Sequence, residues 1–318
     1  MTHWLNQKKR TLALVCASVL LASMAISSCE SVNEDFAAAP APSYDDHFDL
    51  PEIPAAVASG LVVAENDRAV IDFSNTQDGY VMARFFRDAG KDVRVLVIVP
   101  DGTQYQYRLT PGGEYAVFPL SGGNGEYTFG VWENIEGARY ALVVSTTVEV
   151  ALSDEFAPFL RPNQFVNYNR DSAAVRKAAE LTEGIVSSMD IVSAIYNFVI
   201  TNITYDKELA ATVQSGYLPD VDEVLEKGQG ICFDYAALMA AMLRSLGVPT
   251  RMVFGYTGDE YHAWISVHLE ETGWIDNVIF FDGLDWNLMD PTFAASGQSS
   301  ELMDYIGDSS NYQARFMY

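Results

Sequence analysis

Hydrophobic residues recur along this chain with two different periods, and the change between them constrains the fold more than any other feature. From about residue 60 to 152, apolar positions alternate in short runs that Gly, Asn, Asp and Pro interrupt. Runs of this kind are typical of the strands of an antiparallel sandwich. The predicted strands are Ala69–Phe73, Tyr80–Arg87, Val93–Val99, Tyr105–Leu109, Tyr127–Trp132 and Tyr140–Val150.

From about residue 155 the spacing becomes helical. Apolar residues three and four positions apart predict helices over Ser172–Leu181 and Ser188–Thr201. A short helix, Val221–Lys227, is expected between an Asp220 cap and Gly228. A longer helix follows from about Cys232 to Leu246, with one apolar stripe against the core. The strand patterns that return after it, and that with the helices predict an α+β domain, are Thr250–Gly255, His262–Leu269, Val278–Phe281 and Trp286–Met289.

The first thirty residues have the layout of an export signal. A basic start at residues 8–10 precedes an apolar run, Leu12 to Ile26, that is short for a membrane span. The ending Ile26-Ser27-Ser28-Cys29 resembles the bacterial lipobox, in which the signal is cut before a cysteine that becomes lipidated. An ordinary signal peptide or an uncleaved anchor is the alternative. We therefore expect an exported chain that faces outside the cytoplasm and is anchored to the membrane by lipid on Cys29.

These patterns predict a two-domain protein behind a signal and a tether. Residues 1–28 form the signal peptide, and 29–58, rich in Ala, Pro and acid, form the tether. Residues 59–153 form an all-β antiparallel sandwich as an accessory domain, and 154–318 form the α+β domain.

The charge of the chain excludes one class of partner. With 19 Lys and Arg against 43 Asp and Glu, the net charge is −24 over 318 residues. Nucleic-acid binding needs clustered basic residues, so no nucleic-acid partner is expected. Electrostatic adsorption to anionic lipid is disfavoured for the same reason.

Cysteine usage points to one reactive residue. Cys16 leaves with the signal and Cys29 carries lipid, so Cys232 stays alone in the exported part. It follows the glycine-bounded turn Gly228–Gly230 and opens a helix, where free N–H groups favour a thiolate and can hold an oxyanion. A buried cysteine acting as a small hydrophobe is the alternative.

A thiolate nucleophile needs a base, and histidines are scarce: beyond the signal the chain has His47 in the tether, His262 and His268. His262 and His268 lie on one face of the same predicted strand, about 20 Å apart, so only one can approach Cys232. We expect His268 to be a solvated strand residue. Asp290, at the end of a strand before Pro291, could orient the imidazole, although spacing alone does not select it over Asp282 or Asp285.

Three ordered blocks resemble the transglutaminase-like superfamily over about residues 170–295. The first runs from Gly228 to Ala236 and continues through Leu243–Arg251 and Gly255-Tyr256. The second is Tyr261-His262-Ala263-Trp264. The third is Trp286 with Met289-Asp290-Pro291-Thr292-Phe293.

The resemblance implies a papain-like core with Cys232 as nucleophile, His262 as general acid and base, and Asp290 as orienter of the imidazole. Attack on an amide carbonyl would give a thioester, which water hydrolyses or an amine converts into a cross-link. Gln229 and Tyr205 are candidates for the oxyanion partner.

The expected function is that of a surface-tethered cysteine enzyme acting on protein or peptide amides, cell-wall peptides included, with hydrolysis favoured. The alternatives are a protein-glutamine cross-linking transferase and a non-catalytic surface binding module. No cofactor is expected. A metal site is not expected either, because the sequence has no His-Glu-x-x-His or Cys-x-x-Cys motif.

Overall fold

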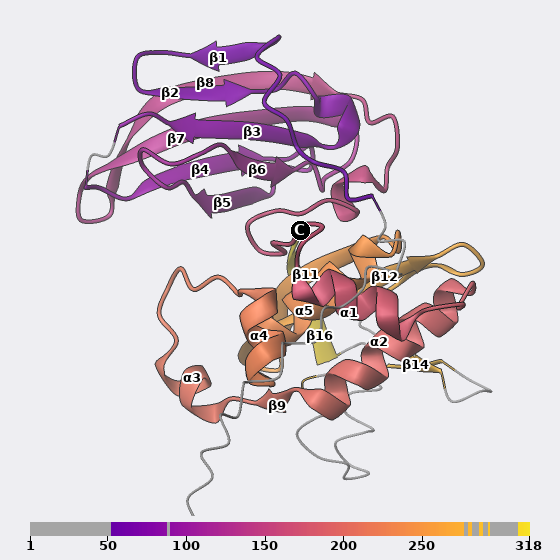
Figure 1. Cartoon of the computed structure of the whole chain (residues 1–318). Helices are drawn as coiled ribbons and strands as arrows, with labels where there is room; N and C mark the ends of the chain where they lie inside the picture. The colour runs from indigo at the N-terminus through magenta and orange to yellow at the C-terminus, as the bar shows by residue number, and fades with distance from the viewer. Residues whose placement is uncertain (1–51, 88–89, 277–278, 282–285, 289–291, 293–310) are drawn as a thin grey trace, which may run out of the picture. The chain divides into compact units, whose positions relative to one another are not determined.

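A computed structural model of the chain describes residues 52–87, 90–276, 279–281, 286–288, 292 and 311–318. Between residues 63 and 150 the chain forms two antiparallel four-stranded sheets, with the strand orders β1-β2-β3-β6 and β5-β4-β7-β8 (Figure 1). The strands are β1 (Val63–Glu65), β2 (Ala69–Asp72), β3 (Tyr80–Phe85), β4 (Val93–Ile98), β5 (Gln104–Arg108), β6 (Ala116–Pro119), β7 (Gly125–Glu136) and β8 (Arg139–Val150).

The alternation seen in the sequence directs one face of each sheet into a shared core. In β4, Val93, Val95 and Val97 are buried while the residues between them are half-buried. Ile71 and Phe118 of the other sheet belong to the same hydrophobic core. The antiparallel sheets predicted from the sequence are therefore confirmed, although the short strands β1 and β6 were not predicted.

Five helices of the described residues lie C-terminal to the two sheets: α1 (Ala173–Leu181), α2 (Ser188–Asn202), α3 (Lys207–Thr212), α4 (Val221–Lys227) and α5 (Cys232–Ser245). The sequence predicts one buried stripe on α5, but the structure buries every residue of this helix from Asp234 onward. Its sides contact α1, α2 and α4 as well as β11 (Thr250–Thr257) and β12 (Glu260–Leu269) (Figure 1). Small residues at 236, 237, 240 and 241 allow this close approach on all sides.

The sheet beside α5 has the order β13-β12-β11-β16 and is antiparallel throughout. Its outer strands are β13 (Gly273–Ile275) and β16 (Tyr312–Met317). β12 is buried on both faces from His262 to Val267, which differs from the one-sided pattern expected from the sequence. The backbone of two further strands, β14 (Ile279–Phe281) and β15 (Trp286–Leu288), pairs antiparallel. The result is a mixed fold of helices and antiparallel sheets.

The described residues belong to one compact unit whose hydrophobic core continues from the first two sheets into the helical region. The rings of Tyr105 in β5 and Tyr318 after β16, for example, lie 5.2 Å apart. The predicted boundary between residues 153 and 154 therefore stays a prediction. The predicted signal (1–28) and most of the predicted tether (29–58) lie outside the described residues. No helix in the described part of the chain is both long and apolar enough to cross a membrane.

Candidate active site

A tight turn delivers Cys232 to the first position of α5. α4 begins at Asp220, whose side chain accepts hydrogen bonds from the N–H groups of Asp222 and Glu223, and ends at Gly228 with φ +61°. The next two residues form β10 (Gln229–Gly230), which pairs parallel with β9 (Thr204–Tyr205). The cap and end predicted for this short helix are confirmed, and they fix where α5 begins.

Asp234 holds the first turn of α5 together from inside the protein. Its Oδ2 accepts a hydrogen bond of 2.7 Å from the N–H of Ile231, and its Oδ1 accepts one of 2.7 Å from the hydroxyl of Tyr217. The side chain is fully buried, and this burial raises the pKa of its carboxyl. Gly230 is required beside it, because a Cβ there would stand 2.5 Å from the Cβ of Asp234.

Cys232 and His262 line one cavity of about 400 Å³, which we call the cysteine cavity. Cys232 is half-buried, and within the part of the chain that the structure describes it is the one cysteine and a free thiol. The loop 213–217 and the side chains of Tyr205, Phe254 and Tyr261 complete much of the wall. The structure therefore brings the proposed nucleophile and base, from α5 and β12, to the same space.

His262 is held in place by packing within the sheet. Only 6% of the residue is exposed, and it pairs with Gly255 across the β11–β12 ladder. Its ring lies 6.1 Å from that of Trp264, with 24° between the two planes. These packing contacts limit the orientations that the imidazole of His262 can adopt.

His268 differs from the prediction that it is solvated. It is half-buried, and its ring packs 4.3 Å from that of Phe156 and 5.4 Å from that of Trp274. Trp274 pairs with it across β12 and β13, so the neighbouring strand supplies a cover that the sequence of β12 alone does not reveal. His268 is not among the residues that line the cysteine cavity.

Of the remaining predicted site residues, one lines the cysteine cavity, one does not, and two are not described by the structure. Tyr205 is half-buried and lines the cysteine cavity, whereas Gln229 is exposed and is not among its lining residues. Asp290 and Cys29 lie outside the described residues.

Arg244, near the end of α5, is a second buried charge that the sequence did not predict to be buried. Its guanidinium donates to the carbonyls of Thr250 at 2.8 Å, Arg161 at 2.8 Å and Tyr318 at 2.6 Å. Burial lowers its pKa to about 10. The helix that carries Cys232 is thereby tied at its far end to three separate segments.

Two tyrosines of the cysteine cavity did not stand out in the sequence as functional residues. Tyr217 was missed because it lies in a loop without periodicity and reaches Asp234 only through the fold. Tyr261 precedes His262, so its position in the histidine block was the available signal. Partial burial, and then the charges of Tyr256 and Cys232, raise the pKa of Tyr261.

Among the described residues, no group of three or more His, Cys, Asp or Glu side chains is arranged to hold a metal ion. The cysteine cavity brings together a thiol, an imidazole and the N–H groups at the start of a helix, a set suited to nucleophilic attack on a carbonyl.

Residues 175–277 match the model of the Transglutaminase-like superfamily. The matched segment contains Cys232 and His262 and ends before Asp290. This region is therefore a transglutaminase-like domain, a class that suggests a cysteine-type enzyme.

Two curated proteins are similar to part of the chain. The uncharacterized protein YebA of Bacillus subtilis is 30% identical over 118 residues, which cover 31% of this chain and 16% of that protein. The protein-glutamine gamma-glutamyltransferase of Pseudomonas aeruginosa is 28% identical over 109 residues, which cover 29% of this chain and 14% of that protein. The similarity to both relatives is thus confined to a small part of their length.

Among solved structures, a candidate cysteine protease from Cytophaga hutchinsonii aligns with a TM-score of 0.38 and 14% identity, covering 81% of this chain and 74% of that one. Red sea bream transglutaminase aligns with a TM-score of 0.29 and 12% identity, covering 72% of this chain and 53% of that one.

Proposed function

We propose that this protein is a cysteine enzyme that cleaves amide or peptide bonds of proteins or peptides through a thioester on Cys232. The observation that carries the proposal is that Cys232, at the amino end of α5, and His262, buried in β12, line the same cavity. The match of this segment to the transglutaminase-like superfamily supports it.

In the first half of the proposed reaction, His262 takes the proton of the Cys232 thiol and the sulfur attacks the substrate carbonyl carbon. The carbonyl oxygen becomes an oxyanion, which the N–H groups at the start of α5 can stabilise. Tyr205 is the candidate for a second donor, since it lines the same cavity. The C–N bond then breaks, His262 returns its proton to the leaving nitrogen, and a thioester remains.

In the second half, His262 takes a proton from water and the resulting hydroxide attacks the thioester carbonyl. The C–S bond breaks, and the thiolate recovers the proton from His262. The products are a carboxylic acid and free enzyme. In this proposal Asp290 accepts a hydrogen bond from the imidazole and fixes its orientation.

Transfer to an amine is the second candidate reaction, favoured by the name of the P. aeruginosa relative, a protein-glutamine gamma-glutamyltransferase. An amine would then attack the thioester in place of water and form a new amide. We favour hydrolysis, because a site outside the cytoplasm meets abundant water, and cell-wall peptides are among the substrates such a location offers.

The deciding experiment incubates the mature chain with a glutamine-containing peptide, casein and a cell-wall digest, each with a labelled amine. Ammonia from the glutamine peptide reports thioester formation in either reaction; a glutamate product or peptide fragments indicate hydrolysis, and incorporated label indicates transfer. Cys232→Ser should lower either activity at least about 10³-fold. His268→Gln is the matched control and should retain activity. Binding of substrate without either product would overturn the enzyme proposal in favour of a binding module.

The location of the protein is a separate part of the proposal. Lipid on Cys29 would hold the enzyme on the outer side of the cytoplasmic membrane, an attachment that a chain of charge −24 does not obtain from electrostatics. Mass spectrometry of the mature protein should find an acylated amino-terminal Cys29, and Cys29→Ser should release the chain from membranes. An unmodified protein that begins at another residue would contradict the anchor.

A further inference from the structure

Three cavities of the protein adjoin one another through shared lining residues. The cysteine cavity shares Ser215, Gly216 and Tyr217 with a second cavity of about 250 Å³, which we call the middle cavity. The middle cavity shares Arg94 and Gln106 with a third of about 560 Å³, the sheet cavity. The three cavities thus form a series of neighbours between Cys232 and the outer face of the sheet β5-β4-β7-β8.

The outer face of this sheet carries a row of four side chains, one from each strand. Arg108 pairs with Arg94, Arg94 with Trp132, and Trp132 with Leu142. Adjacent strands lie about 4.8 Å apart, so the backbones at Arg108 and Trp132 are about 10 Å apart. About three residues of an extended peptide span that distance.

Arg108 connects this row to the loop that lines the cysteine cavity. A Cβ at Gly216 would stand 2.4 Å from Cζ of Arg108, so the guanidinium lies directly against the loop backbone. Gly216 also has φ +90°, a conformation that other residues rarely adopt. The loop is thus shaped to accept an arginine from the sheet, beside Ser215 and Tyr217 of the cysteine cavity.

The charge of Arg108 is available to a ligand. Arg108 is exposed, and within the described ranges it forms no salt bridge. The nearby carboxylate of Asp92 is already engaged, since it accepts hydrogen bonds from Arg94 at 2.8 Å and from the hydroxyl of Tyr140 at 2.6 Å. In a chain with 43 acidic and 19 basic residues, an unpaired arginine beside the candidate active site favours an anionic ligand group.

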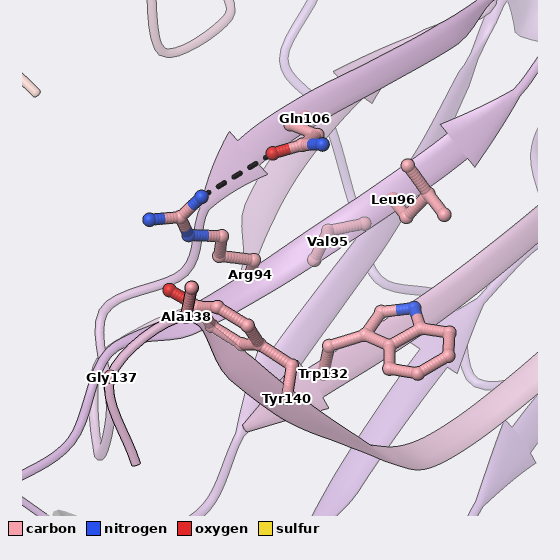
Figure 2. A pocket seen from close by; sticks show the side chains of 8 residues that line it. All are labelled: Arg94, Val95, Leu96, Gln106, Trp132, Gly137, Ala138 and Tyr140. Carbon is pink, nitrogen blue, oxygen red and sulfur yellow. Dashed lines mark hydrogen bonds between the residues drawn. The ribbon is translucent and has the colours of Figure 1, made fainter. Parts of the chain in front are cut away.

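The sheet cavity offers a different chemistry at the other end of the row. Trp132, Tyr140 and Leu96 give it apolar surface, and Arg94, hydrogen bonded to Gln106 at 3.3 Å, gives it a polar edge (Figure 2). The guanidinium of Arg94 lies 4.8 Å from the centre of the Tyr140 ring and holds that ring in place. An apolar side chain can replace water on this surface.

We propose that the middle and sheet cavities bind an extended acidic segment of the peptide substrate. A carboxylate of the substrate pairs with Arg108, and an apolar side chain about three residues further along packs on Trp132 and Tyr140. The sheet is then a specificity element of the enzyme. This inference rests on the proposed function for its substrate class, but its binding step is tested without chemistry.

The test measures binding of dye-labelled glutamine peptides to the full mature chain carrying Cys232→Ser, by fluorescence anisotropy. One series carries Glu at successive distances from the glutamine, with Leu three residues beyond it, and a matched series carries Ser in place of Glu. One Glu position should bind at least about tenfold more tightly than its Ser counterpart. Arg108→Gln should remove that preference and leave binding of the Ser peptide unchanged.

Arg87→Gln is the control, because Arg87 is an exposed arginine that pairs with Asp67 and lines neither the middle cavity nor the sheet cavity. Trp132→Ala should weaken binding of both series through the apolar residue. Equal binding of Glu and Ser peptides at every position would overturn the proposal, as would a preference that survives Arg108→Gln. A neutral oligosaccharide that displaces the peptide and loses affinity in Trp132→Ala but not in Arg108→Gln would assign the face to glycans and also overturn it.

Turnover separates this inference from the proposed function. Suppose that the wild-type chain binds the Glu peptide in a way that depends on Arg108, but releases neither ammonia nor fragments and incorporates no amine. The proposed function then fails, and the proposed binding of an acidic segment is supported. If the chain turns over Glu and Ser peptides equally, with or without Arg108, the proposed binding of an acidic segment fails and the proposed function is supported.

Discussion

The two sheets between residues 63 and 150 differ in what lies on their outer faces. In the sheet β1-β2-β3-β6, all four residues of β2 are buried, because neighbouring segments cover the face that does not meet the core. The N–H of Gly60 donates to Asp72 at 2.6 Å, and the N–H of Val57 donates to the Tyr80 hydroxyl at 3.1 Å. In the sheet β5-β4-β7-β8, β5 alternates exposed and buried residues from end to end.

This difference separates the two roles that a sheet of this kind can serve. The sheet β1-β2-β3-β6, which we call the covered sheet, packs against other residues on both faces. The sheet β5-β4-β7-β8, which we call the open sheet, packs mainly through its inner face. Its outer face is free to carry side chains with little value for the core, such as Arg108 and the exposed Leu142. The face that contributes less to folding is therefore the one that can be adapted to a ligand.

The largest expected effect comes from the covered sheet. Val70→Ala in β2 removes two methyl groups buried on the face that does not meet the shared core and should lower the free energy of unfolding by about 2–3 kcal/mol. Leu142→Ala, at a position 48% exposed on the open sheet, should lower it by less than about 1 kcal/mol. Urea denaturation followed by circular dichroism gives both values, and similar losses in the two variants would remove the distinction between the sheets.

A smaller effect should follow from pH at the edge of the open sheet. Burial alone would raise the pKa of Asp92, but hydrogen bonds from Tyr140 and Arg94, and the charges of Arg94 and Arg108, outweigh it and hold the pKa below 3.8. The stability that the Asp92 carboxylate contributes is thus present above pH 3.8 and is lost as the pH falls through the lowered pKa.

Asp92→Asn tests this directly. The wild-type chain should be more stable than the variant near neutral pH by less than about 1 kcal/mol, since the group is partly exposed. That gap should close well below pH 3.8, as measured by urea denaturation at both pH values. A gap that keeps its size in acid would mean that the charge of Asp92 is not its source.

The sequence predicts those elements whose signals are local. The helix Val221–Lys227 was predicted with its cap at Asp220 and its end at Gly228, because the residues that cap a helix are adjacent to it in the sequence. The alternating strands of the two sheets were found within a few residues of their observed ends for the same reason. Of the candidate site, Cys232, His262 and Tyr205 were selected from the sequence and line one cavity.

Features that depend on distant segments were not predictable in this way. β16 pairs with β11 although about sixty residues separate them in the chain, and Trp274 covers His268 from a neighbouring strand. Asp234 and Arg244 lie in the first and last turns of α5, where an acid and a base complement the helix dipole even when they are exposed. The buried Asp234 is hydrogen bonded to Tyr217, and the buried Arg244 to three carbonyls of other segments. The spacing of hydrophobic residues in the sequence does not indicate contacts of this kind.

The hydrogen bonds of Arg244 also set an order of events during folding. One of its three acceptors is the carbonyl of Tyr318, which also accepts from the N–H of Met252 at 2.8 Å. Synthesis proceeds from the amino end, so α5 and β11 are made before Tyr318. Until then the guanidinium lacks a partner that its burial requires. The helix that carries Cys232 therefore reaches its final packing only after β16 has paired with β11.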